Sequence, residues 1–190
     1  MSKIIAFENM TLDGVMQAPG RPGEDDRGGF PHGGWASEYM DEVMMARAQE
    51  GMSRSGSIMF GRRTYEDFFQ VWPNAGDNPF TEKLNKTTKY VVSSTLQEPL
   101  PWQNSVLINI DKVRELKETP GDDIVILGSG KLVRELHKRN LIDAYALQIH
   151  PLSLGVGQPL FEAYADLELV DSATSSTGVI LATYRNRQAK

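Results

Sequence analysis

A strand, a tight glycine turn and an amphipathic helix follow one another in residues 123–136, and this unit constrains the fold more than any other segment. Asp123–Leu127 is an apolar run that predicts a buried strand, and Gly128–Gly130 forms the turn before the predicted helix. Glycine lets the backbone approach an anion closely, and a helix N-terminus presents unpaired N–H groups and the positive end of its dipole. The unit therefore indicates a phosphate-binding turn.

Two familiar glycine codes do not fit this turn. A dinucleotide fingerprint of the Rossmann type needs glycine where Val133 stands, and an acidic residue about 20 positions further on, near Gln148. A Walker loop needs glycine at Val125 and a hydroxyl residue at Leu132. What remains is a short Gly-Ser-Gly turn, and a plain strand-to-helix connection without a ligand stays open as its alternative.

Length, charge and composition limit the class of protein. A chain of 190 residues predicts one domain, residues 1–190, and the absence of cysteine excludes a disulfide framework and a thiolate nucleophile. The net charge is −5 with dispersed cations, which argues against nucleic acid as a partner, and no apolar run is long enough for a membrane span. The histidines lack the spacing of metal ligands, so no metal is expected. We expect a cytoplasmic location.

Strands and helices alternate along most of the chain and predict a parallel sheet with an antiparallel hairpin at its C-terminal end. Besides the unit at 123–136, the expected strands are Lys3–Glu8, Ser57–Phe60, Lys89–Ser93, Ser105–Asn109, Ile142–His150, Leu167–Thr174 and Val179–Arg185. Helices are expected at Ser37–Arg54 and Asp111–Lys117, capped by Ser37 and Asp111. The glycine- and proline-rich segment Gln17–Gly34 is too long for a plain connection and is interpreted as a lid or binding loop.

Groups suited to anions follow three of the predicted strands. Gly61–Thr64 follows one strand, Ser93 and Ser94 follow the next, and Gly128–Gly130 follows a third. In parallel sheets ligands bind at the carboxyl ends of strands, so these groups are expected to lie near each other. Glycine amides suit a pyrophosphate, and arginine with hydroxyl groups suits a phosphate monoester. NADPH carries both kinds of phosphate.

Several ordered motifs resemble the dihydrofolate reductase-like superfamily, most closely the branch named for the C-terminal reductase domain of the bacterial riboflavin-biosynthesis deaminase-reductase. The motifs are Thr11–Gly14, Gly61–Glu66, Tyr90–Ser94, Ile126–Leu132 and Leu141–Phe161. The resemblance covers nearly the whole chain. It implies an α/β three-layer fold around a mixed, mostly parallel sheet of about eight strands. It also implies NADPH as hydride donor and, for a stand-alone member, a homodimer.

The resemblance implies roles for particular residues. Arg62, Arg63 and Thr64 would contact the adenosine-side phosphates, Ser93 and Ser94 the 2′-phosphate, and Gly14 would belong to a loop over the nicotinamide. The remaining residues expected to bind the cofactor are Gly61, Gly128, Ser129, Gly130, Lys131 and Leu132.

The substrate side is less defined. The candidate acids are Asp13, Glu38 and Asp41, for which turn formation and helix-dipole stabilisation are the alternative roles. Trp35 is either a platform for an aromatic substrate or a loop anchor. The predicted function is NADPH-dependent reduction of a small nitrogen heterocycle, for example 5-amino-6-(5-phosphoribosylamino)uracil in riboflavin biosynthesis. The alternatives are a non-catalytic nucleotide-binding or sensor protein and a true dihydrofolate reductase.

Overall fold

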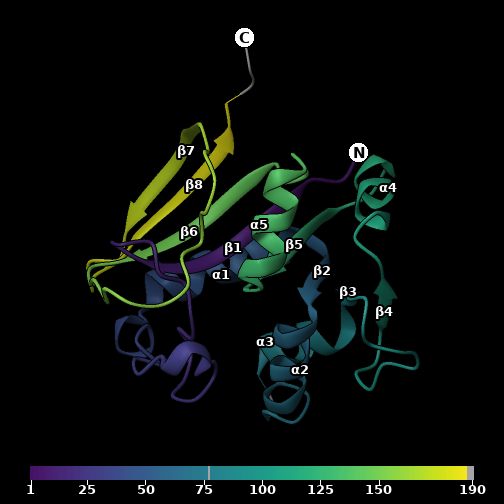
Figure 1. Ribbon diagram of the computed structural model, residues 1–190, viewed down its shortest axis with the longest axis horizontal. Coiled ribbons are helices and arrows are strands. Elements are labelled where there is room, and N and C mark those ends of the chain that lie inside the picture. Colours follow the sequence, from purple (N-terminus) through teal and green to yellow (C-terminus); the bar gives the residue numbers. More distant parts are fainter. Residues whose placement is uncertain (77, 188–190) are drawn as a thin grey trace.

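Eight strands form one continuous mixed sheet, as predicted from the sequence (Figure 1). The computed structural model describes residues 1–76 and 78–187, and within them the strand order is β4-β3-β2-β5-β1-β6-β8-β7. The strands are β1 (Ile4–Thr11), β2 (Ser55–Gly61), β3 (Thr88–Val92), β4 (Ser105–Ile108), β5 (Asp123–Leu127), β6 (Ala144–His150), β7 (Leu167–Thr174) and β8 (Ile180–Asn186). Strands β1 to β6 pair in parallel, whereas β8 is antiparallel to β6 and to β7.

Five α-helices flank the sheet, and three of them differ from the sequence prediction. They are α1 (Glu42–Arg54), α2 (Arg62–Val71), α3 (Pro79–Lys86), α4 (Lys112–Glu118) and α5 (Gly130–Lys138), within the described residues. The prediction of a helix from Ser37 is wrong: Ser37–Tyr39 is a separate 3-10 turn, Met40 is extended, and the Asp41 side chain caps α1 by accepting from the Met44 amide at 2.9 Å. Helix α4 is capped by Asn109, whose Oδ1 accepts from the Lys112 amide at 2.9 Å, rather than by Asp111.

Helix α3 has no counterpart in the sequence prediction, although a local signal precedes it. Asn78 accepts from the Thr81 amide at 2.8 Å, and Pro79 occupies the first helical position. Proline is favoured there because its missing N–H would have had no partner within the helix. The Asn-Pro pair was therefore sufficient to indicate a helix start.

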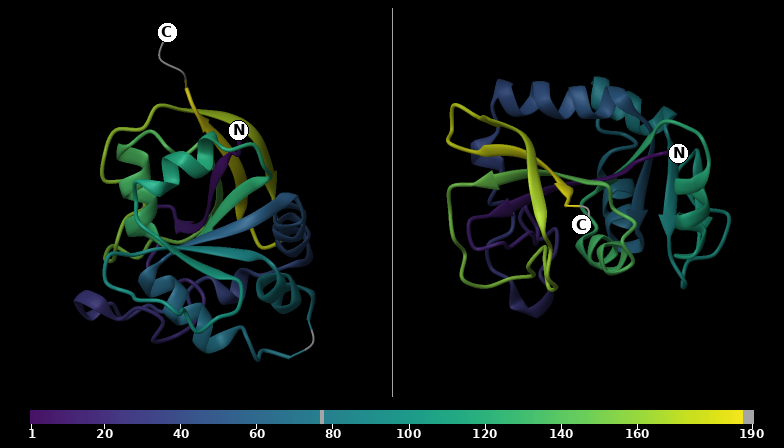
Figure 2. Two further views of the ribbon diagram at one scale, coloured as in Figure 1. Left: turned by 90° about the vertical axis from the view of Figure 1, so that its right-hand side faces the viewer. Right: turned by 90° about the horizontal axis from the view of Figure 1, so that it is seen from above.

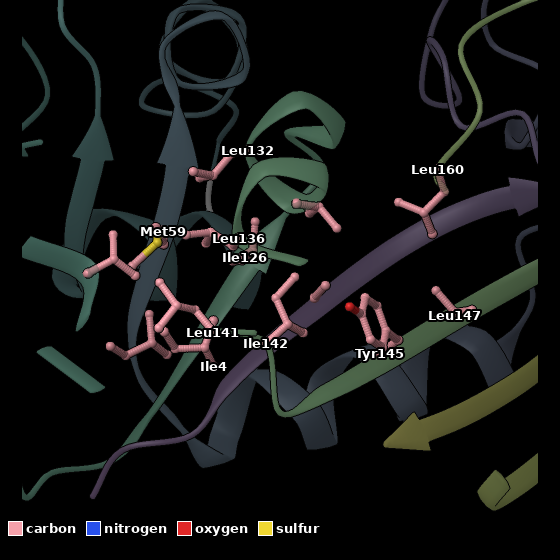
Figure 3. Packing of buried hydrophobic residues seen from close by; sticks show 14 of the residues in the cluster. Ile4, Met59, Ile126, Leu132, Leu136, Leu141, Ile142, Tyr145, Leu147 and Leu160 are labelled. Carbon is pink, nitrogen blue, oxygen red and sulfur yellow. The ribbon is translucent and has the colours of Figure 1, made fainter. Parts of the chain in front are cut away.

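Helices lie on both faces of the sheet (Figure 2), and an apolar cluster covers each face. On one face, Leu132 and Leu136 of α5 and Val113 of α4 pack on Ile4 and Ile126, and Figure 3 shows the α5 leucines pointing towards these strands. The opposite face carries residues from α1, α2 and α3, namely Met52, Tyr65 and Leu84, packed with Ile58, Phe60 and Val125. Helices α2 and α5 therefore lie on opposite faces, although they follow the neighbouring strands β2 and β5.

Candidate functional site

After β2 the chain passes to one face of the sheet, and after the neighbouring strand β5 it passes to the other face. The carboxyl ends of these two strands therefore form a topological switch point. Such switch points create a crevice in which open α/β sheets bind ligands. Helices α2 and α5 both begin there, and neither has a side-chain hydrogen bond that caps its N-terminus. By contrast, α1 and α3 are capped by Asp41 and Asn78. The first-turn amides of α2 and α5 thus remain suited to an anion.

Ser129 joins the two helix starts. Its Oγ accepts from the Gly61 amide at 3.0 Å, which connects the glycine before α2 to the residue before α5. Ser129 and Gly128 have positive φ values of 66° and 57°, whereas Gly130 does not. A Cβ at Gly128 would lie 3.3 Å from Thr64 Cγ2, so the backbone of the turn passes close to the first turn of α2. The predicted cofactor residues Gly61, Thr64, Gly128 and Ser129 are therefore brought together.

Cations lie beside this crevice at the start of both helices. Arg62 is partly exposed and pairs with Glu66 at 3.5 Å within α2, whereas Arg63 and Lys131 are exposed without an ion pair to any described residue. Cations at a helix N-terminus oppose the helix dipole, so an anionic ligand would relieve an unfavourable local charge. Leu132 belongs to the apolar core beneath α5 and offers its backbone rather than its side chain.

The two predicted serines after β3 differ in the hydrogen bonds that their hydroxyl groups make. Ser93 Oγ accepts from the amides of Thr95 and Leu96, both at 3.1 Å, and so shapes its own turn. Ser94 is exposed and makes no side-chain hydrogen bond within the described residues. Of the two, Ser94 has the hydroxyl that remains available to a ligand.

Asp13 connects two loops of the site. Its carboxylate accepts from the Leu154 and Gly155 amides at 3.1 and 2.7 Å, and from the Thr11 hydroxyl. The Thr11 hydroxyl bond, followed by the Gly155 amide bond, holds the pKa of Asp13 far below its ordinary value. Gly14 donates its amide to the Thr11 carbonyl at 2.9 Å within the same turn. A lowered pKa favours the ionised form of Asp13, which accepts hydrogen bonds and has no proton to donate, and its role as proton donor stays a prediction.

The two acidic residues near α1, Asp41 and Glu38, differ in their contacts. Besides capping α1, Asp41 accepts from the Ser176 amide and hydroxyl at 2.6 and 2.7 Å, which ties α1 to the β7–β8 hairpin. The Met44 amide and the Ser176 hydroxyl lower the pKa of Asp41. Glu38 is exposed on its 3-10 turn. Neither observation tests a substrate contact.

The segment Gln17–Gly34 is folded as a compact loop with its own small core. The Gln17 side chain donates to the carbonyls of Asp25 and Arg27 at 3.1 and 3.0 Å and accepts from the Gln158 amide at 3.1 Å. Trp35 donates its Nε1–H to the Gln17 carbonyl at 2.7 Å, is only 9% exposed, and packs with the apolar residues Val15, Ala18 and Phe30. Trp35 thus anchors the loop, and its role in substrate binding stays a prediction.

Two buried groups close to this site were not singled out from the sequence. Glu8 on β1 is 2% exposed, and burial raises the pKa of its carboxyl group well above the ordinary value. His150, at the end of β6, is completely buried, and burial lowers the pKa of its imidazole to about 4. Its Nε2 is 3.0 Å from Asn9 Oδ1, and its ring lies edge-on to Trp35 and Tyr39 at centroid distances of 5.1 and 5.3 Å. The only signal for Glu8 was a charge at an alternate position of an apolar strand.

A hollow at the other edge of the sheet does not belong to this site. It has a volume of about 200 Å³ and is lined by Ser57, Thr88, Gly121 and Asp122 among others, near the amino ends of β2, β3 and β5. It lies away from both uncapped helix termini, so we assign it no ligand. Within the described residues no helix combines the length and apolar character that a bilayer crossing needs.

The fold and the paired helix starts define a mixed-sheet α/β domain of the dihydrofolate reductase-like type. A dihydrofolate reductase from Enterococcus faecalis, solved with NADP(H) and RAB-propyl, superposes with a TM-score of 0.62 at 12% identity, covering 98% of this chain and 97% of that one. The family model described as RibD C-terminal domain matches residues 2–181, and the chain belongs to that family.

Two further proteins are similar over nearly their whole length. The protein YyaP of Bacillus subtilis (strain 168) is 31% identical, with 96% of this chain and 94% of YyaP covered. A putative riboflavin biosynthesis protein from Shewanella sp. PV-4 superposes with a TM-score of 0.68 at 20% identity, covering 98% and 99% of the two chains. The family and the fold support a reductase of the riboflavin-biosynthesis type.

Proposed function

We propose that this chain is an NADPH-dependent reductase of a small nitrogen heterocycle, of the kind that acts on 5-amino-6-(5-phosphoribosylamino)uracil. The observation that carries the proposal is the pair of uncapped helix starts, α2 and α5, joined through Ser129 at adjacent strand ends. Membership in the RibD C-terminal domain family supports the reductase class.

The residues at the crevice fit the chemistry of such a cofactor. The first-turn amides of α5 would hold the pyrophosphate, because they are donors at the positive end of a helix dipole. Arg62 and Arg63 would hold the 2′-phosphate with Ser94, because guanidinium groups bind phosphate through paired hydrogen bonds. When bound, the cofactor supplies a hydride. The protein would orient the substrate beside it and exclude water with the loop 17–34.

Cofactor preference tests the proposal. A charge-assisted hydrogen bond contributes about 1.5–3 kcal/mol, so even one such bond predicts at least about tenfold tighter binding of NADPH than of NADH. We expect Arg62→Ala combined with Arg63→Ala to remove this preference in calorimetric titrations while leaving NADH binding nearly unchanged. Arg54→Ala is the matched control, because Arg54 is an exposed arginine at the far end of α1 whose ion-pair partner among the described residues is Glu50. Equal affinity of the parent protein for both cofactors would refute the assignment.

Turnover is tested separately from binding. We expect NADPH oxidation with 5-amino-6-(5-phosphoribosylamino)uracil and none with dihydrofolate. NADPH binding without oxidation by pyrimidines, pterins or quinones would instead support a non-catalytic sensor. Oxidation driven by dihydrofolate would establish a folate reductase.

A further inference from the structure

Glu8 is a carboxylic acid on the apolar face of β1. It follows Ile4 and Ala6 at alternate positions, so the three side chains share the face that packs against α5. Its register partner on β6 is Leu147, which belongs to the same apolar cluster. Figure 3 shows Leu147 and Leu160 beside this part of β1.

The carboxyl group of Glu8 has no partner in the described part of the chain. Oε1 is fully enclosed without a hydrogen bond, and only 2% of the residue is exposed. Buried polar side chains almost always have a hydrogen-bond partner, and a residue that lacks one needs an explanation. Burial raises the pKa of this carboxyl group well above its ordinary value, which favours the neutral form, and the Arg134 guanidinium opposes that effect without reversing it. A neutral carboxyl can donate a hydrogen bond to a ligand.

Glu8 lies next to the glycine turn of the proposed cofactor site. The carbonyl of Phe7, the preceding residue, accepts from the Gly128 amide at 3.4 Å. Arg134 follows one turn after the start of α5, and its Nη1 would be 3.3 Å from a Cβ at Gly130. Glu8 is therefore placed between the central strand and the first turns of the helix whose amides face the crevice.

Arg134 is held rigidly near Glu8. Its Nη1 donates to the Pro159 carbonyl at 2.6 Å, its Nε pairs with Glu162 at 3.2 Å, and only 11% of its side chain is exposed. Tyr145 of β6 and His137 of α5 also lie on this side of the sheet, and their Oη and Nδ1 atoms are 2.6 Å apart. Arg134 is thus the fixed positive charge that a Glu8 carboxylate would meet.

We propose that Glu8 is the proton donor of the reductase and faces the ligand at the nicotinamide end of the cofactor. The inference rests on the proposed function and deepens it by assigning the acid. Hydride, with its electron pair, would be supplied by the breaking of a C–H bond of the cofactor. A new C–H bond would form at the carbon of the substrate C=N group, which in the ribosylamine is the open-chain imine, and the π pair of the C=N group would move to nitrogen. The Glu8 O–H bond breaks, its proton forms the N–H bond, and the resulting carboxylate faces Arg134. Water then returns a proton to Glu8.

The other candidate acids suit this role less well. Asp13 and Asp41 are ionised acceptors of backbone amides, and hydrogen bonds lower the pKa of both. A general acid must hold its proton at the working pH, and the raised pKa of the buried Glu8 carboxyl favours that state.

Carboxyl NMR tests the placement of Glu8 without turnover. In protein labelled with ¹³C at the glutamate carboxyls, the resonance missing from Glu8→Gln identifies Glu8. Glu168→Gln provides the control, because Glu168 is half-exposed and pairs with Arg185 at 3.0 Å. We expect the Glu8 resonance to titrate well above the ordinary glutamate value, and to shift on addition of NADPH but not of 2′,5′-ADP, which lacks the nicotinamide. An ordinary titration, or equal shifts with both ligands, would overturn the placement.

Thermal unfolding gives an independent check of the neutral state. The folded pKa of Glu8 is raised, so the unfolded state loses its proton first as pH increases, and the parent loses stability above the ordinary glutamate pKa. The midpoint of Glu8→Gln should therefore rise relative to the parent with increasing pH, whereas that of Glu168→Gln should not. A constant difference at all pH values would contradict the neutral carboxyl.

Kinetics test the proton transfer itself. With 5-amino-6-(5-phosphoribosylamino)uracil as substrate, we expect Glu8→Gln to lower kcat by about 10²–10⁴-fold, to leave KM and NADPH affinity within about twofold, and to lose the limb of the pH profile that reports the acid. A variant with parental kcat would refute the role of Glu8. Failure of the parent to turn over this substrate would count against the proposed function instead, and the NMR titration would still decide whether Glu8 faces the nicotinamide.

Discussion

The close contact between Gly130 and Met16 allows a quantitative prediction. A Cβ at Gly130 would lie 2.5 Å from Met16 Sδ and 2.8 Å from Cε, about 1 Å inside the normal separation of roughly 3.5–4.0 Å. Overpacking costs about 1–3 kcal/mol, and replacing glycine by alanine in a helix gains up to about 1 kcal/mol. The Met16 thioether is the end of a flexible side chain, so we expect Gly130→Ala to lower the free energy of unfolding by up to about 2 kcal/mol, or the midpoint by up to roughly 8 °C.

Thermal unfolding with a double-mutant cycle measures this contact. Gly51, in the interior of α1, has no heavy atom near a built Cβ. We expect Gly51→Ala to stabilise the protein by about 0.5–1 kcal/mol. In a Met16→Ala background the clash at Gly130 is absent, so Gly130→Ala should be neutral or stabilising there.

Additivity would refute this reasoning. If the effects of Gly130→Ala and Met16→Ala add within about 0.5 kcal/mol, the thioether does not dictate glycine at this position. If they couple, a larger residue at Gly130 changes the packing against Met16 as well as the space for phosphate.

Three further outcomes follow from contacts at the site. Burial lowers the pKa of His150 to about 4, so the unfolded state, in which the pKa is 6.5, is protonated first as the pH falls. The free energy of unfolding of the parent should therefore decrease by up to about 3 kcal/mol between pH 6.5 and pH 4. Thermal melts of His150→Gln should not show this pH dependence. Asp41→Ala should lower the unfolding midpoint, by an amount that shrinks as acid protonates Asp41 in the parent, whereas Glu38→Ala should leave the midpoint unchanged. Gln17→Ala should accelerate tryptic cleavage after Arg27, observed by mass spectrometry, because the Gln17 side chain holds the loop together; unchanged cleavage would mean that Trp35 alone anchors the loop.

The sheet was predictable from the sequence because its strands are apolar and bounded by turn residues. The strand Leu167–Thr174 was predicted with its observed bounds. The error at Ser37 has a physical cause: Ser37 and Asp41 are both good caps, and only the extended Met40 and the Ser176 contact select Asp41. That contact joins residues 135 positions apart, so no local pattern contains it.

The candidate site was predictable in part. Glycines and arginines at strand ends carry a local signal, which explains why the crevice residues could be named from the sequence. The surroundings of Glu8 and His150 could not be, because their burial depends on α5, the loop 17–34 and neighbouring strands. A charge becomes unusual only when the elements that enclose it are known.

The central position of β1 has a consequence for how the chain acquires its fold. Although it is the first strand in sequence, β1 pairs with β5 and β6, from Ile4↔Ile124 and Ile5↔Ala144 onwards. During synthesis both of its edges stay unpaired until most of the chain has emerged, and such distant pairings fold slowly. An N-terminal fragment that stops before β5 exposes the apolar edges of β1 and should aggregate rather than form a smaller stable domain.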